Sequence, residues 1–156
     1  MLLVDRENRV LLFRFIPGPR DPDQREIWIT PGGGIDAGEQ PHEAAARELL
    51  EETGLVVDAQ ALLPMVAFSE GFADLRGWLK GIFRDNYFFH RVEYHEVDPT
   101  GQERWESEQI RGAHWWSADE LRGSDARIIP LRLADLLDDL VAGRFPGQPW
   151  ELEWHH

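Results

Sequence analysis

The sequence predicts a single α+β domain in which a mixed β-sheet lies between helices. The length of 156 residues suits one domain with a real core. Hydrophobic residues make up 42% of the chain, which argues against a disordered protein. The third observation is the order of segments: strand-like runs, an amphipathic helix, more strands and a C-terminal helix. We see no repeat or linker, so we expect one domain over residues 1–156, with an irregular tail at 143–156.

The first quarter of the chain is predicted to form three strands. Residues 2–4 and 10–16 are apolar and rich in strand formers, and the polar stretch 5–9 between them fits a hairpin turn. Prolines and a glycine make residues 17–23 a loop. Residues 26–30 form a short strand that runs directly into Pro31-Gly32-Gly33-Gly34. Such a turn lets a ligand approach the backbone closely, although a merely tight turn would look the same.

An amphipathic helix follows the glycine turn. Pro41 suits its first position, with Gln40 as a mediocre N-cap, and Gly54 ends it as a C′ residue should. Ala45, Ala46, Leu49 and Thr53 cluster on one face and suit burial against a sheet. We therefore expect the helix to cover one face of the predicted sheet.

The remaining elements are less regular. We expect strands at 55–57 and 62–68, a loop or a loosely formed strand pair at 69–80, and a central strand at 87–92. A turn at 98–101, an acidic loop at 103–109 and a strand at 113–116 follow. The capping box Ser117-Ala118-Asp119-Glu120 begins a helix, and leucines at helical spacing predict another helix over 130–141. Trp150 and Trp154 in the tail are expected to be docked or disordered rather than functional.

Three carboxylates share the helix face opposite the apolar one. With Glu48 at zero, Glu52 falls about 40° to one side and Glu51 about 60° to the other, because a helix advances about 100° per residue. Arg47 lies one turn before Glu51 and can pair with it. Unpartnered, these glutamates would repel one another. A solvated acidic face with a surface ion pair is one interpretation. A hard divalent cation such as Mg²⁺ or Mn²⁺, which prefers oxygen ligands, is the other.

The spacing favours the cation. Gly33 is followed after five residues by Glu39, and after seven more by Arg47-Glu48-Leu49-Leu50-Glu51-Glu52-Thr53-Gly54-Leu55. This resembles the Nudix box, G-x5-E-x7-R-E-U-x-E-E-x-G-U, where U is a bulky aliphatic residue, and every fixed position is filled. The chain is identified on this motif as a member of the Nudix (MutT-like) hydrolase family. The box covers only 23 residues, from Gly33 to Leu55.

The resemblance implies a fold, a reaction and a set of site residues. The fold would be an α/β/α sandwich. The reaction would be hydrolysis of a nucleoside diphosphate linked to another moiety X, by water activated on Mg²⁺ or alternatively Mn²⁺. By position, Glu48, Glu51 and Glu52 look like the metal ligands, with Glu51 and Glu52 also counted as catalytic. Arg47 looks like an orienting residue, and Glu39 would reach a further ion or only shape the turn.

The general base is left open by the sequence. Similar enzymes use a box glutamate or a glutamate from a later loop, and Glu103, Glu106 and Glu108 are the loop candidates. We favour Glu106 or Glu108, because their loop precedes the strand that contains Trp115 and Trp116. Each of these glutamates, taken singly, also fits a solvent-facing loop acid.

The substrate contacts are less specific. The backbone of Gly32, Gly33 and Gly34 is expected to line the pyrophosphate or metal site. Arg14 is a candidate phosphate donor, and Trp28, just before the glycine turn, is a candidate for stacking a base. A surface ion pair and a core position are the respective alternatives. Motifs that mark the NADH, ADP-ribose and coenzyme A subgroups are not evident, and Gly71 stands near the position where the ADP-ribose subgroup has a proline.

Charge and composition limit the partners. Net charge is 16 − 29 = −13, so we expect no binding to nucleic acid or to anionic membranes. No apolar run approaches the length of about 20 residues that crosses a bilayer. The absence of cysteine excludes thiolate chemistry and fits a cytoplasmic protein. Many Nudix relatives dimerise, so a homodimer is one expectation for the assembly. A non-catalytic Nudix-like module that senses a nucleotide is the alternative function.

Overall fold

A six-stranded mixed sheet forms the centre of the protein, as seen in a computed structural model that describes residues 1–16, 26–74, 80–101 and 109–155. Its strands are β1 (Leu2–Val4), β2 (Val10–Phe15), β3 (Ile27–Ile29), β6 (Phe89–Arg91), β7 (Ile110–Trp116) and β8 (Arg127–Ile129). The order is β6-β1-β2-β3-β8, and β7 also pairs with β2. The β1–β6 and β3–β8 pairs are parallel, and β2 is antiparallel to β1, β3 and β7.

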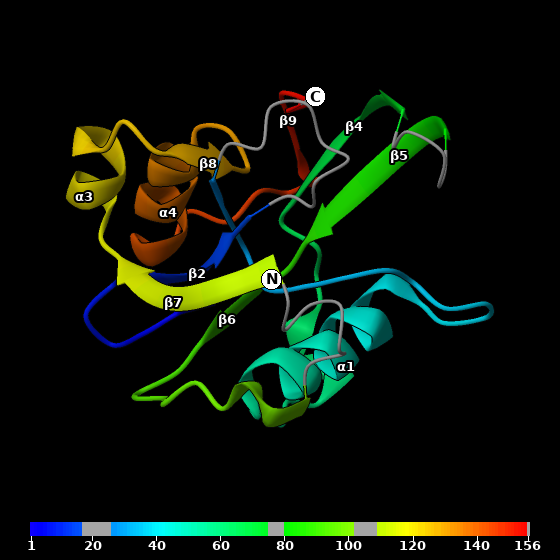
Figure 1. The fold of residues 1–156 in the computed structure, drawn as a ribbon, viewed down its shortest axis with the longest axis horizontal. Coiled ribbons are helices and arrows are strands. Elements are labelled where there is room, and N and C mark those ends of the chain that lie inside the picture. Colours follow the sequence, from blue (N-terminus) through cyan, green and yellow to red (C-terminus); the bar gives the residue numbers. More distant parts are fainter. Residues whose placement is uncertain (17–25, 75–79, 102–108, 156) are drawn as a thin grey trace.

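Helices cover both faces of this sheet and make an α/β/α sandwich. Helix α1 (Pro41–Thr53) lies on one side, and α3 (Ala118–Gly123) and α4 (Leu133–Val141) lie together on the other (Figure 1). Side chains alternate between the two faces, as the pleat of a strand requires. Leu11 packs in the same cluster as Leu49 of α1, whereas its neighbours Val10 and Leu12 pack in the cluster of α3 and α4.

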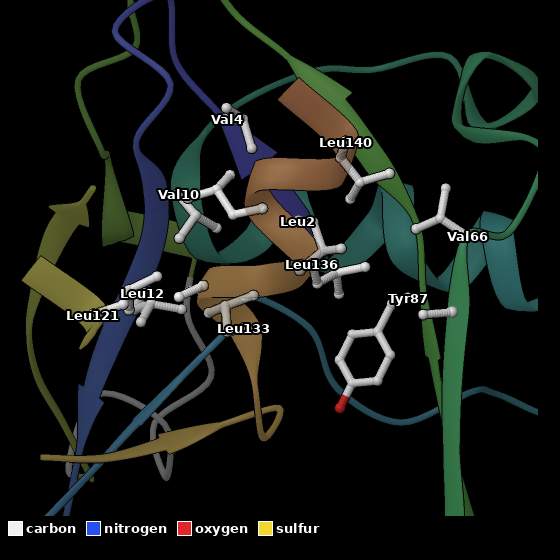
Figure 2. Close-up of a cluster of buried hydrophobic side chains, with 13 residues drawn as sticks. Leu2, Val4, Val10, Leu12, Val66, Tyr87, Leu121, Leu133, Leu136 and Leu140 are labelled. Carbon is white, nitrogen blue, oxygen red and sulfur yellow. The ribbon is translucent and has the colours of Figure 1, made fainter. Parts of the chain in front are cut away.

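The core under α4 explains the leucine spacing of that helix. Figure 2 shows Leu133, Leu136 and Leu140 pointing toward Leu2 and Val4 of β1, with Val10 and Leu12 of β2 beside them. These leucines recur every three or four residues and therefore lie on one stripe of the helix. The helix begins at Leu133, three residues later than the predicted start at 130.

A second, three-stranded sheet lies beside the first. It consists of β4 (Ala67–Asp74), β5 (Lys80–Tyr87) and β9 (Trp150–Leu152), in the order β5-β4-β9. Strands β4 and β5 form an antiparallel hairpin, and β9 from the C-terminal tail pairs parallel with β4. Figure 1 shows the hairpin extending away from the central sheet on the same side as the tail.

The predicted elements around the acidic helix are confirmed. Strands β1, β2 and β3 lie where their sequences predict them, and α1 begins at Pro41 after the extended N-cap Gln40. Gly54 adopts the left-handed conformation at the end of the helix. Ser117 and Glu120 form the predicted capping box of α3. The loop at 17–23 and most of the acidic loop at 103–109 lie outside the described residues.

Three predicted strands between residues 55 and 92 differ from the structure. Residues 55–57 have no strand partner, because the chain enters a short 3₁₀ helix, η1 (Ala59–Leu62), capped by Asp58. The run at 62–68 enters a strand only at Ala67. The strand-pair alternative for 69–80 is the one observed, since residues 69–74 of β4 pair with β5, while residues 75–79 lie outside the described residues. The predicted central strand at 87–92 is divided between two strands, because Tyr87 ends β5 and β6 begins at Phe89. Strand β6 is the first in the order β6-β1-β2-β3-β8, so it is not central.

The tail is also more ordered than the sequence predicts. Trp150 and Leu152 are partly buried on one face of β9 and pack against the core cluster of α4. Trp154 is docked, since its Nε1 donates to the carbonyl oxygen of Phe72 at 3.1 Å. The period of two in Trp150, Leu152 and Trp154 is a strand pattern that the prediction of an irregular tail overlooked.

Candidate active site

The glycine turn is packed directly against the acidic face of α1. The backbone N–H of Gly32 donates to Oε2 of Glu52 at 2.6 Å. A Cβ atom on Gly33 would lie 2.5 Å from Oε1 of Glu48, closer than real contacts allow, so only glycine fits there without displacing the carboxylate. The close approach of the Glu48 carboxylate to the backbone explains why residue 33, in the turn between β3 and α1, is a glycine.

The acidic face of α1 is largely withdrawn from solvent. Glu48 and Glu52 are 6% and 3% exposed, whereas the side chain of Glu51 is 35% exposed. The interpretation of this face as a solvated charge run is therefore wrong for Glu48 and Glu52. Removing carboxylates from water is costly unless charged or polar partners replace the water. The partners include the backbone N–H of Gly32, which donates to Glu52, and the guanidinium of Arg47, which donates to Glu48.

Arg47 is the cation that connects the glutamates. Its Nη1 donates to Glu48 at 2.7 Å and to Glu51 at 3.2 Å. Its Nε and Nη2 each donate to Glu39 at 3.0 Å, and Nη2 also donates to the carbonyl oxygen of Gly34 at 2.8 Å. One planar guanidinium therefore fixes three carboxylates and the end of the glycine turn, as the five donors of arginine permit.

The hydrogen bonds set the charge state of this network. The guanidinium of Arg47, helped by the backbone N–H of Asp36, holds the pKa of the Glu39 carboxyl below its usual range. Hydrogen bonds to Glu39, and to a smaller extent to Glu48, raise the pKa of Arg47 although partial desolvation acts to lower it. Arg47 is thus a permanent cation. Glu39 helps to shape the turn, which was one of the two roles left open for it.

The donor set of this site fits a hard divalent cation. Three carboxylates contact a single guanidinium, so the negative charge exceeds the positive charge in the cluster. Within residues 1–16, 26–74, 80–101 and 109–155, no three His, Asp or Glu side chains are placed so that together they could hold a metal ion. Mg²⁺ does not need an all-protein cage, because it binds one or two carboxylates and completes its shell with water and substrate phosphates.

A cavity of about 960 Å³ opens beside the cluster. One end is formed by the glycine turn and Glu48, and one wall by Ile27 and Ile29 of β3. Residues of the hairpin β4–β5, the start of β8 and the C-terminal tail also line the cavity. Its polar lining residues there are Asp74, Arg84, Asp85, Asn86, Arg127 and His155. A pocket of this size between two sheets and a helix can enclose a nucleotide-sized ligand.

The structure brings together only part of the predicted site. Gly32, Gly33, Gly34 and Glu48 line the cavity, and Glu51 and Glu52 follow on the same helix face. Glu103, Glu106 and Glu108 lie outside the described residues.

Arg14 and Trp28 do not reach the cavity lining. They are cross-strand partners on the opposite face of the central sheet. Arg14 pairs with Glu26 at 2.6 Å, and Trp28 packs edge-on against Trp116 with ring centroids 5.1 Å apart. These are the ion-pair and core alternatives that the sequence left open for them.

Sequence reasoning missed the far end of the cavity. Asp85 and Asn86 lie on a strand that the sequence did not delimit, and His155 lies in a tail predicted to be irregular. No local motif marks them, because their proximity depends on the pairing of β4 with both β5 and β9. The alternation of Trp150, Leu152 and Trp154 was the only local signal.

Comparison with known proteins identifies the family. The model of the NUDIX domain matches residues 1–138. An RNA pyrophosphohydrolase from Azorhizobium caulinodans is 44% identical over 55 residues, which are 35% of this chain and 33% of the relative. This chain thus spans about a third of the length of that relative.

Solved structures agree on the fold. The NUDIX hydrolase from Nitrosomonas europaea has a TM-score of 0.59 at 24% identity, covering 92% of this chain and 88% of that one. The NUDIX domain of Shewanella oneidensis NrtR, complexed with ADP ribose, has a TM-score of 0.62 at 17% identity, covering 89% and 83%. None of the described helices is long and apolar enough to span a bilayer. Because every fixed position of the Nudix box is filled and the family model matches residues 1–138 of the chain, the chain belongs to the Nudix family.

Proposed function

We propose that this protein is a Mg²⁺-dependent pyrophosphohydrolase that cleaves a nucleoside diphosphate linked to another moiety. The observation that carries the proposal is the buried pair Glu48 and Glu52 beside the glycine turn, of which Glu48 lines the cavity. Membership of the Nudix family supports the reaction class. The curated relative named above supports it further, over the 55 residues that match.

Glu48, Glu51 and Glu52 would hold the ion, with Mn²⁺ as the alternative metal. When bound, the ion would offset charge that develops on the pyrophosphate and lower the pKa of an attacking water. Arg47 would orient the carboxylates of Glu48 and Glu51 through Nη1. The Gly32 N–H would orient that of Glu52. These contacts fix the ligands before substrate arrives, which is the usual role of groups behind a metal site.

The substrate diphosphate would lie along the backbone of Gly32, Gly33 and Gly34. These glycines line the cavity next to Glu48, so a phosphate there would share the ion with the glutamates. The rest of the substrate would extend toward the hairpin β4–β5. Glu106 and Glu108 stay predictions for the general base, beside the box glutamates Glu51 and Glu52.

The test is phosphate release from a panel of nucleoside diphosphate derivatives and nucleoside triphosphates, with Mg²⁺ or Mn²⁺ and a coupled phosphatase. A triphosphorylated RNA belongs in the panel because of the activity in the curated relative's name, although a net charge of −13 disfavours a long polyanion. Turnover should require metal and disappear in Glu52→Gln. The glutamine side chain would keep an oxygen that accepts from the N–H of Gly32, so the fold should survive.

Two other outcomes would count against the proposal. Binding of metal and nucleotide without turnover across the panel would favour a non-catalytic sensing module. Equal turnover in the wild type and in Glu52→Gln would place the metal elsewhere. Parallel Glu106→Gln and Glu108→Gln proteins, compared with Glu51→Gln, identify the base by which of them loses turnover while keeping its affinity for Mg²⁺.

A further inference from the structure

The C-terminal tail forms part of the cavity wall, although it lies beyond residue 138, where the match to the family ends. Strand β9 aligns Trp150 with Ala67 and Leu152 with Ser69 of β4. The chain then continues along the hairpin and carries His155 into the cavity lining. A segment outside the shared domain thus borders the space where substrate is expected.

Gly71 and Trp154 hold the tail in this position. A Cβ on Gly71 would lie 2.3 Å from the indole ring of Trp154, so the ring occupies space that any other residue would fill. The indole Nε1 also donates to Phe72 at 3.1 Å. The backbone N–H of Trp150 donates to Val66 at 3.0 Å. The tail is therefore docked by specific contacts with β4 along its length.

His155 is placed against a carboxylate inside the cavity. Its Nδ1 lies 3.7 Å from Oδ2 of Asp85, and its side chain is 8% exposed. The same Asp85 oxygen accepts from the hydroxyl of Ser69 at 3.4 Å. Arg127 of β8 donates to the carbonyl oxygen of His155 at 3.0 Å. Three separate parts of the chain thus fix one imidazole and one carboxylate side by side.

The chemistry of this end suits hydroxyl groups better than a further phosphate. Asp74 and Asp85 supply carboxylates, with Asp74 paired to Lys80 at 2.9 Å, and Arg84 is engaged by Glu70 at 3.7 Å and by the ring of Phe68, 3.9 Å from its centroid. A carboxylate accepts from hydroxyls, and an imidazole both donates and accepts. Sugar hydroxyls offer both kinds of partner. Burial makes such contacts selective, because a ligand without them leaves the site's polar groups unsatisfied.

We propose that His155 and Asp85 form a subsite for sugar hydroxyls of the substrate, so that the C-terminal tail determines substrate selectivity. The assignment of the ligand as a nucleoside diphosphate derivative rests on the proposed function. The hydroxyls belong either to the nucleoside ribose or to a sugar in the moiety X. The two sources share one chemistry and are separated by the choice of probe.

Calorimetric titration with ADP-glucose, ADP and 2′,3′-dideoxy-ADP tests the subsite, with Ca²⁺ replacing Mg²⁺ to slow turnover. His155→Ala should weaken binding of the hydroxyl-bearing probe about tenfold, the loss expected for a hydrogen bond to a charged or polar buried group. His155→Gln keeps a donor and an acceptor and should retain most of the affinity. His114→Ala, a histidine on β7 away from the cavity, is the matched control and should leave all three affinities unchanged.

The pattern across probes decides the outcome. Loss of the preference for ADP-glucose over ADP assigns the subsite to the sugar of X. Loss of the preference for ADP over 2′,3′-dideoxy-ADP assigns it to the ribose. Unchanged affinities, or equal weakening for all three probes, would overturn the proposal. Gly71→Ala is a second variant, in which His155 itself is not substituted. The added Cβ displaces Trp154, and with it the segment that carries His155, so this variant should reproduce the loss of preference.

Failure of the subsite and failure of the enzyme activity give different results. Wild-type turnover with unaltered selectivity in His155→Ala and Gly71→Ala would reject the subsite and leave the pyrophosphohydrolase proposal intact. Selective binding that depends on His155, with no turnover in Mg²⁺, would reject the activity and leave the subsite. Circular dichroism of each variant shows whether a change in affinity reflects unfolding.

Discussion

Nη1 of Arg47 lies 2.7 Å from Oε1 of Glu48 and also donates to Glu51, so a single nitrogen atom spaces two proposed metal ligands. Glu48 is 6% exposed, and the guanidinium is therefore a principal source of positive charge for a carboxylate that has little water around it. The position of Glu48 depends on the planar fork of arginine as much as on its charge.

Arg47→Lys tests this dependence. Lysine keeps the charge but cannot contact Glu39, Glu48, Glu51 and Gly34 together. Loss of an orienting partner typically costs about 10-fold to 100-fold in metal affinity or activity, so the Mg²⁺ concentration for half-maximal rate should rise by that order. Mg²⁺ titration of the rate measures it. Arg144→Lys, an exposed arginine paired with Asp139, is the control, and an equal effect in both proteins would contradict the role of Arg47.

Gly33→Ala should impair activity more than stability. The new Cβ would meet the end of the Glu48 side chain, which can swing away, so the fold should persist while the carboxylate is displaced. We expect kcat to fall about tenfold or more, equivalent to about 1.4 kcal/mol in the barrier. Steady-state kinetics beside a melting curve measures both effects. Gly123→Ala, where the added Cβ meets nothing within 4 Å, is the matched control.

Mg²⁺ should stabilise the folded protein. A ligand that binds only the native state at about 100 times its Kd adds about 2.7 kcal/mol to the free energy of unfolding. For a domain of this size that raises Tm by several degrees, on the order of 2–4 °C per kcal/mol. The increase should vanish in a Glu48→Gln, Glu52→Gln double variant. A Tm that rises equally in both proteins would place the ion at another site.

Acid should weaken the fold in part through His90. Burial lowers the pKa of His90 on β6, because desolvation disfavours the imidazolium. The unfolded chain then binds a proton at a higher pH than the folded one does. The free energy of unfolding should fall as the pH drops through the ordinary histidine pKa of about 6.5 toward the lower folded value.

Urea midpoints at a series of pH values between 8 and 5 measure this effect, on wild type and on His90→Gln. The wild type should lose more stability than the variant over that interval, since glutamine does not titrate. Identical pH profiles would show that His90 is charged as easily in the folded protein as in the unfolded one.

The sequence alone predicts α1 and its surroundings well, for local reasons. Pro41 and Gly54 mark the ends of the helix, and the spacing of Leu49 and Thr53 predicts which face packs on the sheet. The three glutamates needed no tertiary information, because residues three or four apart on a helix are neighbours. Propensity, capping and periodicity agree over this stretch, and agreement of that kind makes a local prediction dependable.

The hairpin and the tail could not be predicted in the same way. Glu70 to Asp74 contains a glycine and charged residues, and its strand character comes from pairing with β5 and β9 rather than from composition. The face on which Trp28 lies could not be predicted from the sequence for a related reason. A strand residue points to one face or the other, and only the register with β2 and β7 decides which face borders the cavity.

The pairing of β9 with β4 has a consequence for how such a protein can diverge. The acidic helix and the glycine turn contact one another closely, so a substitution in either one disturbs the other. The tail pairs with one edge of a small outer sheet, and its His155 lines the cavity. Substitutions in residues 150–155 would therefore change the lining of the cavity while leaving the glycine turn and α1 as they are.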